Sequence, residues 1–356
     1  MKKTLLATAI AGAMIASGAQ AATVYDQDGT KMDIYGRISM GIAGGGPETD
    51  SNGNAINNDA DFVDAYSRLG LNLSHEVTSD LTAFGRLEWR FNADGGGSVN
   101  EDNGKRTGRF SGFKETRQSY LGLRSNTWGT VQAGNFDSMY NQFVSLPFDV
   151  YIDKGLELQG HPFQSRGDSV AYMTPNLEGF SVGLQAKHYS NRGGPESSEG
   201  TTVAGQGALK YEIDNLRLAL GVVDDVVEGD GNDELLYGAT ASYEFIPGFS
   251  GRLGYEYQSQ NEDLAVNDQG GHETWGIGMS YAVNQWLFNL DYYNVDEKEQ
   301  DSSRDSWSAA AYYNVSSNFQ TFLELNDADA DFDGADTSLN DVRDDVYWLV
   351  GARYFF

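Results

Sequence analysis

The segment DADADFDGAD (327–336) has three acids at the spacing of the first ligands of an EF-hand calcium loop. Asp329, Asp331 and Asp333 would occupy positions one, three and five, with Gly334 next. The twelfth position is Asn340 instead of a bidentate Glu, and no flanking helices are expected. Two interpretations stay open: a dedicated calcium site, or surface carboxylates that bind Ca²⁺ or Mg²⁺ loosely.

Two short patterns could provide a nucleophile. GFSVG (179–183) fits G-x-S-x-G, but that motif needs a strand–turn–helix elbow and no helix is expected after it. His188 and Ser190 would share one face of a strand and could form a nucleophile–base pair, which makes a hydrolase a minor hypothesis that Ser190→Ala would test. The four histidines show no metal-binding spacing, so the sequence predicts neither a catalytic nor a confident metal site.

The composition limits the partners of the chain. Its 356 residues include 52 acids and 24 bases, a net charge of −28, which excludes the basic patch needed to bind nucleic acid. Cysteine is absent, so neither disulfides nor thiolate metal sites are available. Abundant glycine, tyrosine and phenylalanine favour strands and turns over helices.

Residues 1–21 have the pattern of a cleaved secretory signal peptide. Lys2 and Lys3 precede the apolar run LLATAIAGAMIA, and Ala19-Gln20-Ala21 is an A-x-A cleavage site. We therefore expect an exported protein with a single domain over residues 22–356.

Apolar and polar residues alternate with period two along the chain. WLFNLDYYN sets Trp286, Phe288, Leu290 and Tyr292 against Asn289 and Asp291, and similar alternation recurs in NLRLALGVV (215–223) and NFQTFLELN (318–326). Sixteen candidate strands follow, joined alternately by seven short and eight long connections. An even strand number with short turns at one end and long loops at the other predicts a transmembrane β-barrel. A water-soluble all-β fold is the alternative, because alternation is a weak signal in any single strand.

The chain ends in GARYFF, which is unexpected for such an acidic protein. Alternation places Val350, Tyr354 and Phe356 on one face of the last strand, and aromatic rings suit a membrane interface. The pattern of Gly351, Tyr354 and Phe356 resembles the terminal signal that outer-membrane proteins present to the barrel assembly machinery.

With the strands assigned, the whole mature chain resembles the general diffusion porins of Gram-negative outer membranes. The resemblance is clearest in MDIYGRIS (32–39), SRLGLNLSHEVTSDLTAFGRLEWRFN (67–92), ETRQSYLGLRSNTWGTVQAGN (115–135), LEGFSVGLQ (177–185) and the last strand. It implies a homotrimer of sixteen-stranded antiparallel barrels in the outer membrane, with lipid and lipopolysaccharide as neighbours. It also implies a third loop that folds into the lumen and narrows it.

The resemblance also implies the residues of the constriction. Arg37, Arg68, Arg117 and Arg166 match the basic residues of the barrel wall, with Arg117 expected on the lumen face opposite Tyr120. The third loop would span 138–165. Its candidate acids are Asp149, Asp153 and Glu157, although PFDVYIDKGLELQ replaces the PEFGG stretch of the enterobacterial porins.

We therefore predict a passive channel for ions and small hydrophilic solutes, without catalysis or a firmly bound cofactor. Charges in a narrow passage with low-dielectric walls bias ion entry, and the acidic mouth predicts mild cation selectivity. The alternative is a closed structural or adhesive barrel that acts through its acidic outer loops.

Overall fold

The computed structural model describes residues 21–47, 58–93, 98–99, 106–107, 113–160, 166–190, 201–298, 302–330 and 345–356. Residues 1–20 of the predicted signal peptide (1–21) and the acids Asp331 and Asp333 lie outside these ranges. No helix in the described part of the chain is long and apolar enough to cross a membrane.

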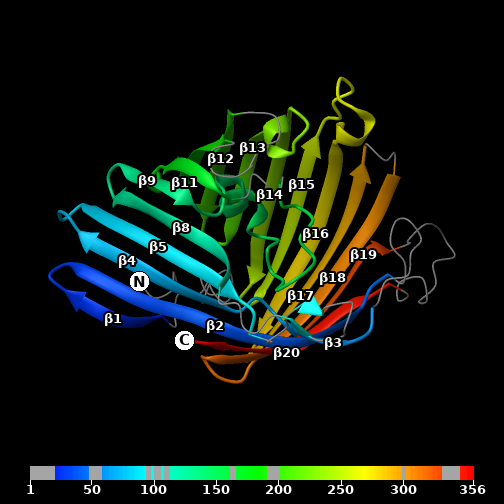
Figure 1. Cartoon of the computed structure of the whole chain (residues 1–356), viewed down its shortest axis with the longest axis horizontal. Helices are drawn as coiled ribbons and strands as arrows, with labels where there is room; N and C mark the ends of the chain where they lie inside the picture. Colours follow the sequence, from blue (N-terminus) through cyan, green and yellow to red (C-terminus); the bar gives the residue numbers. More distant parts are fainter. Residues whose placement is uncertain are drawn as a thin grey trace.

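The fold is a closed antiparallel barrel of sixteen strands (Figure 1). These are β2 (Thr30–Gly45), β4 (Arg68–Glu76), β5 (Leu81–Phe91), β8 (Phe113–Ser125), β9 (Gly129–Asn135), β10 (Asp168–Met173), β11 (Phe180–Tyr189), β12 (Thr202–Ile213), β13 (Leu216–Asp225), β14 (Glu234–Ile246), β15 (Phe249–Gln258), β16 (His272–Val283), β17 (Trp286–Glu297), β18 (Ser302–Asn314), β19 (Phe319–Ala330) and β20 (Tyr347–Phe355). The sixteen strands predicted from the alternation are confirmed.

Short elements complete the structure. They are the strands β1 (Ala22–Gln27), β3 (Asp61–Asp64), β6 (Ser98–Val99) and β7 (Arg106–Thr107), the π-helical turn η2 (Asn141–Ser145) and the 3₁₀ turns η4 (Val227–Gly229) and η5 (Val266–Asp268). Strand β1 pairs with residues 30–34 of β2, which also pair with the barrel strand β4, so β1 and β4 lie on opposite edges of β2.

The barrel closes between its first and last long strands. β20 pairs with β2 from Phe355 opposite Arg37 to Tyr347 opposite Gly45, and the backbones of Gly36 and Phe356 exchange two hydrogen bonds of 2.9 and 3.1 Å. Among the described residues, this pairing closes the ring of sixteen long strands, and so avoids exposing unpaired backbone groups to lipid, which would cost several kcal/mol each.

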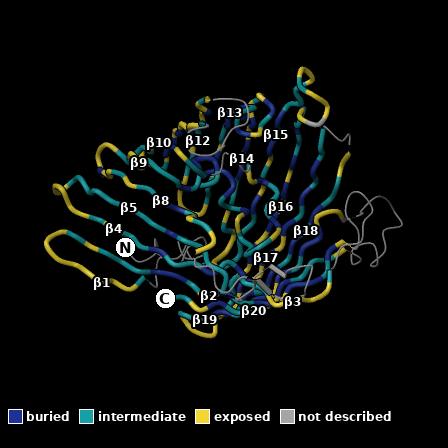
Figure 2. Tube along the Cα trace, in the orientation of Figure 1, coloured by how far each residue is buried: buried dark blue, intermediate teal, exposed yellow. Residues whose placement is uncertain are grey.

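Buried and exposed residues alternate along the wall strands, as the sequence pattern predicts (Figure 2). On β17, Trp286, Phe288 and Leu290 are exposed on the outer face, while Leu287, Asn289 and Asp291 are buried against the contents of the lumen. The outward side chains are thus apolar, where lipid replaces water, while polar side chains such as Asn289 and Asp291 face inward.

Candidate functional site: the narrowed lumen

Residues 136–160, which follow β9, enter the barrel and lie against the inner wall (Figure 1, green trace inside the barrel). We call this segment the inner loop; residues 161–165 of the predicted third loop lie outside the described residues. Phe136, Met139, Tyr140, Phe143 and Val144 of this loop are at most 2% exposed. They form one apolar cluster with wall residues of β10 and β12–β14, namely Ala171, Ala208, Ala219, Val223 and Leu236.

Glycines on the lumen face make room for the inner loop. A Cβ atom on Gly183 would lie 2.8 Å from the sulfur of Met139, and one on Gly221 would lie 2.7 Å from a methyl of Val144. Five strands in all carry such a glycine beneath the loop or its neighbours: Gly183 on β11, Gly221 on β13, Gly238 on β14, Gly254 on β15 and Gly276 on β16. We call this row the glycine floor. It lets the loop backbone approach the wall closely.

Polar contacts fix the rest of the loop to the wall. Glu324 on β19 accepts hydrogen bonds from the backbone N–H groups of Ile152 (2.6 Å) and Asp153 (3.3 Å). The Tyr151 hydroxyl donates to Asp291 on β17 at 2.7 Å, and burial together with that carboxylate raises the pKa of Tyr151, which keeps the donor proton in place. Tyr140 donates to Glu256 on β15 at 2.6 Å. Buried wall carboxylates therefore serve as acceptors for the loop.

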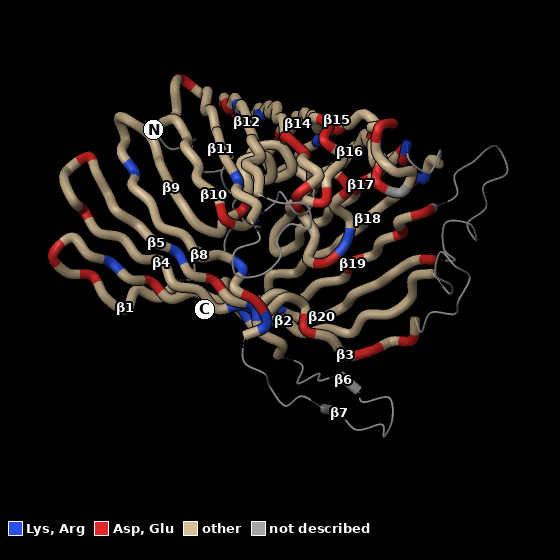
Figure 3. Tube along the Cα trace, turned by 45° about the horizontal axis from the view of Figure 1, so that its top comes forward, with Lys and Arg blue, Asp and Glu red and all other residues tan. Residues whose placement is uncertain are grey.

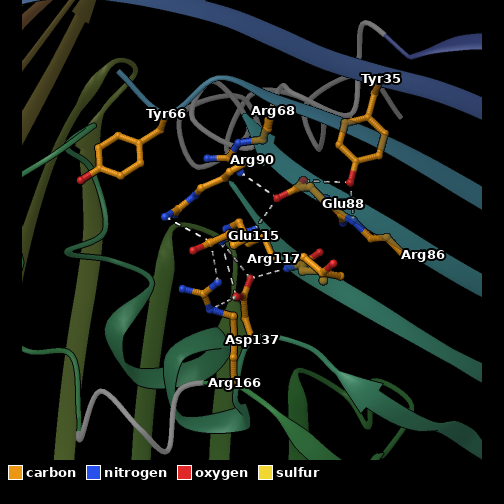
Figure 4. A network of polar contacts seen from close by, with 12 residues as sticks. Tyr35, Tyr66, Arg68, Arg86, Glu88, Arg90, Glu115, Arg117, Asp137 and Arg166 are labelled. Carbon is orange, nitrogen blue, oxygen red and sulfur yellow. Dashed lines mark hydrogen bonds and ion pairs between the residues drawn. The ribbon is translucent and has the colours of Figure 1, made fainter. Parts of the chain in front are cut away.

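The opposite wall carries a network of arginines and acids, drawn in Figure 4. Its centre is Glu88 on β5, whose side chain is 0% exposed and forms ion pairs with Arg117 (2.8 Å), Arg86 (3.2 Å) and Arg68 (3.3 Å). The Tyr35 hydroxyl donates to the same carboxylate at 2.8 Å. A buried carboxylate with several cationic partners holds their guanidinium groups in fixed positions.

Two further acids extend this network toward β10. Glu115 pairs with Arg90 at 3.3 Å and with Arg166 at 3.5 Å, and Asp137 lies 3.4 Å from Arg117 and 3.7 Å from Arg166. Figure 3 shows basic and acidic residues gathered beside β2. The structure therefore brings together three of the four expected basic residues, Arg68, Arg117 and Arg166.

Arg37 borders the network through Arg68, its register partner on β4. Its Nε atom donates to the carbonyl of Tyr66 at 3.0 Å. Arg37, Arg68 and Arg117 thus lie on the lumen side of β2, β4 and β8, and Arg166 joins them from just before β10.

The expected opposition of Arg117 and Tyr120 is wrong. Glu88 pairs with Gln118 and Trp89 with Thr116, so Arg117 is the extra residue of a β-bulge. The bulge turns both Arg117 and Gln118 inward, where each contacts Asp137. Tyr120 is likewise on the inner side, 5.8 Å from the Phe136 ring. A bulge changes the side-chain alternation by one residue, which simple period-two counting cannot anticipate.

The three candidate loop acids have different surroundings. Asp149 is solvent-exposed in the lumen. Desolvation raises its pKa, the nearby charge of Asp137 adds to this rise, and the charges of Arg117, Arg68 and Arg37 oppose it. Asp153 accepts hydrogen bonds from the hydroxyls of Tyr66 and Tyr347, the latter at 2.6 Å. Glu157 forms a two-point pair with Arg304 on β18, at 3.2 and 2.9 Å. Only Asp149 therefore faces the arginine network without a close ion-pair partner among the described residues.

Several members of the network were not predicted, although the sequence contains a signal for them. Arg86, Glu88 and Arg90 alternate in RLEWR (86–90), so one face of this strand is fully charged. A charged face on a membrane strand can only point into the lumen, which identifies all three. No comparable signal marks Asp137, because it lies in the loop beyond β9.

The other expected sites lie away from the lumen or outside the described residues. His188 is exposed on the outer face of β11, two residues before Ser190. Asp329 is exposed near the end of β19. In the C-terminal strand, Tyr354 is 47% exposed on the outer face, and Gly351 lies close to the Phe322 ring and the Met40 carbonyl, where a side chain would not fit. An assembly role for these residues remains a prediction.

Comparison with known proteins identifies the barrel. The model of one family, described as Gram-negative porin, matches residues 7–334. The chain belongs to this family. It is 29% identical to a monosaccharide porin of Halomonas over 381 aligned positions, covering 99% of this chain and 91% of the relative.

Solved structures show the same fold. The anion-selective porin from Comamonas acidovorans superposes with a TM-score of 0.68 at 19% identity, covering 92% of this chain and all of the other. The trimer form of OmpT from Vibrio cholerae gives a TM-score of 0.60 at 14% identity, with the same coverage. As a Gram-negative porin, this protein resides in the outer membrane, crosses it with its strands and forms a channel for passive diffusion.

Proposed function

We propose that this porin is a homotrimeric, mildly cation-selective channel for ions and small hydrophilic solutes. The observation that carries the proposal is the position of Asp149, which is exposed on the inner loop near the arginine network. The charges of Arg117, Arg68 and Arg37 oppose the rise in its pKa that desolvation and Asp137 cause. Opposite charges across a narrow aqueous passage produce a transverse field, and solutes must align with it as they pass.

Two charge distributions oppose each other in setting the selectivity. On the wall side, six arginines outnumber four nearby acids. The arginines are Arg37, Arg68, Arg86, Arg90, Arg117 and Arg166, and the acids are Glu88, Glu115, Asp137 and Asp149. The whole chain nevertheless carries a net charge of −28, which raises the cation concentration at the mouth. Because the local and global charges have opposite signs, we expect only a weak preference for cations.

The trimer is supported by kinship with porins, one of which, OmpT of Vibrio cholerae, is known in a trimer form. The exposed apolar outer face suits both lipid and a neighbouring copy of the chain. Contacts with lipopolysaccharide and the barrel assembly machinery, and loosely bound Ca²⁺ or Mg²⁺ near Asp329, stay predictions.

A planar bilayer experiment tests this proposal directly. The purified protein should insert with conductance steps in threes, and its reversal potential in a KCl gradient should have the sign of a cation-selective pore. Asp149→Asn should lower the cation-to-anion permeability ratio by about twofold or more, since one charge in a low-dielectric passage shifts the local potential strongly. Glu262→Gln, in the exposed loop before β16, is the matched control and should change the ratio much less, because salt screens a single solvent-exposed charge at the mouth.

Other outcomes would exclude parts of the proposal. A silent bilayer would favour the closed structural or adhesive barrel. An anion-selective potential would mean that the arginine network outweighs Asp149 and the acidic mouth. The charged, partly exposed lumen favours the open pore, and membership of a family of channels favours transport over catalysis.

A further inference from the structure

A cavity of about 300 Å³ lies between the inner loop and the wall, next to the arginine network. Its lining comes from β3, the start of β8, the ends of β5 and β20 that adjoin the long loops, and the inner loop. The volume is at the lower end of the range of small-molecule sites. A solute that travels along the lumen could therefore pause here.

One end of the cavity is cationic. Arg90 places its guanidinium 4.8 Å from the centre of the Tyr66 ring and pairs with Glu115 at 3.3 Å, and its buried Nε atom has no hydrogen-bond partner. Lys114 also lines the cavity and is exposed. It is the extra residue of a second β-bulge, since Arg90 pairs with Glu115 and Phe91 with Phe113. Bulges re-aim side chains, and this one adds a cation beside Arg90.

The other end of the cavity offers hydrogen-bond acceptors. Asp153 accepts from the hydroxyls of Tyr66 and Tyr347, which uses their only protons. Burial and the bond to Asp153 raise the pKa of Tyr66, so this arrangement persists over the neutral range. The two phenol oxygens and the remaining lone pairs of the carboxylate can then only accept further hydrogen bonds. An ammonium group satisfies such a set, in competition with Lys154, whose Nζ atom lies 4.8 Å from the centre of the Tyr347 ring.

The cationic and accepting ends are joined by one side chain. The Tyr66 ring lies under the guanidinium of Arg90, and the Tyr66 hydroxyl contacts Asp153. We infer that this cavity is a transient binding subsite for small zwitterions of the amino-acid type, with the carboxylate at Arg90 and Lys114 and the ammonium at Asp153. The inference rests on the proposed open pore and specifies one class of solute that the pore retains.

A matched set of solutes tests the inference. 4-Aminobutyrate, butyrate and butylammonium have the same chain length and differ only in their charged ends. Each is added to single channels of the full-length trimer in a bilayer, and the reduction and excess noise of the ion current give a half-blocking concentration. We expect 4-aminobutyrate to block at a concentration about tenfold lower than either singly charged solute, because it alone makes charge-assisted contacts at both ends.

Variants separate the two ends. Arg90→Gln and Asp153→Asn should each raise the half-blocking concentration of 4-aminobutyrate by about tenfold. The controls Arg124→Gln and Asp263→Asn remove charges that do not line the cavity and should leave block unchanged. Unblocked conductance of each variant confirms that it has folded and inserted.

Three results would overturn the inference while leaving the channel function intact. The first is the same half-blocking concentration for all three solutes. The second is a half-blocking concentration for butyrate as low as that for 4-aminobutyrate. The third is a half-blocking concentration of 4-aminobutyrate that is unchanged in both Arg90→Gln and Asp153→Asn. A wild-type protein that gives no conductance at all would instead contradict the proposed function.

Discussion

Gly238 lies directly beneath the ring of Tyr140, so closely that a Cβ atom on this glycine would overlap the tyrosine hydroxyl. That hydroxyl donates to Glu256 at 2.6 Å, one strand further along the wall. The absence of a single side chain on β14 thus permits the contact that holds the first part of the inner loop in the lumen.

Replacing this glycine should displace the inner loop. In Gly238→Ala the Tyr140 ring must move, and both its hydrogen bond and its packing in the apolar cluster are disturbed, at a local cost of about 1–3 kcal/mol. We expect an altered single-channel conductance and a changed size limit for sugars in liposome-swelling assays. Gly205→Ala is the control, because nothing lies within 4 Å of the position its Cβ would take. Identical conductance in the two variants would show that Gly238 does not determine the position of the loop.

Glu88 should control the charge of the wall. Glu88→Gln leaves Arg68, Arg86 and Arg117 without their shared carboxylate, so the passage gains one net positive charge in a low-dielectric setting. We expect the cation-to-anion permeability ratio to fall by roughly twofold to fivefold. Reversal potentials of Glu88→Gln and of the control Glu262→Gln are compared to check this. Equal permeability ratios in the two variants would mean that the charge of Glu88 does not affect ion selectivity.

Much of the fold could be predicted because lipid imposes a simple rule on alternate residues. Trp286, Phe288 and Leu290 face outward on β17 as their alternation predicts. The rule fails at Arg117, where a bulge adds one residue to β8 without any change in composition. Local sequence therefore defines the strands, while the exceptions within them require the pairing partner.

The surroundings of the loop acids could not be predicted for a related reason. Asp153 and Glu157 are held by Tyr347 and Arg304, which lie on strands far away in the sequence. The partner of a loop carboxylate depends on where the loop settles, and that is decided by glycines on β11 to β16. A charge count cannot distinguish Asp149, which faces the arginines, from acids that bind the wall.

Weakening the hydrogen bonds between Glu324 and the inner loop should loosen the loop without destabilising the barrel. In Glu324→Gln, an amide nitrogen replaces one carboxylate oxygen and cannot accept a hydrogen bond. One of the backbone N–H groups of Ile152 and Asp153 therefore loses its acceptor, and the Tyr312 hydroxyl loses a charged one. We expect hydrogen exchange at the amides of residues 152 and 153 to accelerate by about tenfold, from a local loss of about 1–3 kcal/mol. The barrel strands, held by their backbone ladders, should exchange as in the wild type. Uniform acceleration in every strand would show that this carboxylate stabilises the whole barrel.

At the opposite end of the barrel, Asp80 should make stability depend on pH. This carboxylate, in the turn between β4 and β5, accepts from the Ser125 hydroxyl at 2.6 Å, the Asn126 N–H at 3.1 Å and the Thr127 hydroxyl at 3.3 Å. The hydrogen bond from Ser125 is the largest cause that holds the pKa of Asp80 below its ordinary value. A pKa depressed by folding stabilises the native state above the unfolded pKa of about 3.9, and that contribution is lost as pH falls through the lower folded value. Asp80→Asn should therefore lower the thermal midpoint in detergent near neutral pH, with the difference from wild type vanishing in strong acid. Asp263→Asn, at an exposed position, provides the baseline. If the difference between Asp80→Asn and wild type instead stays constant down to strong acid, the charge of Asp80 is not what stabilises the turn.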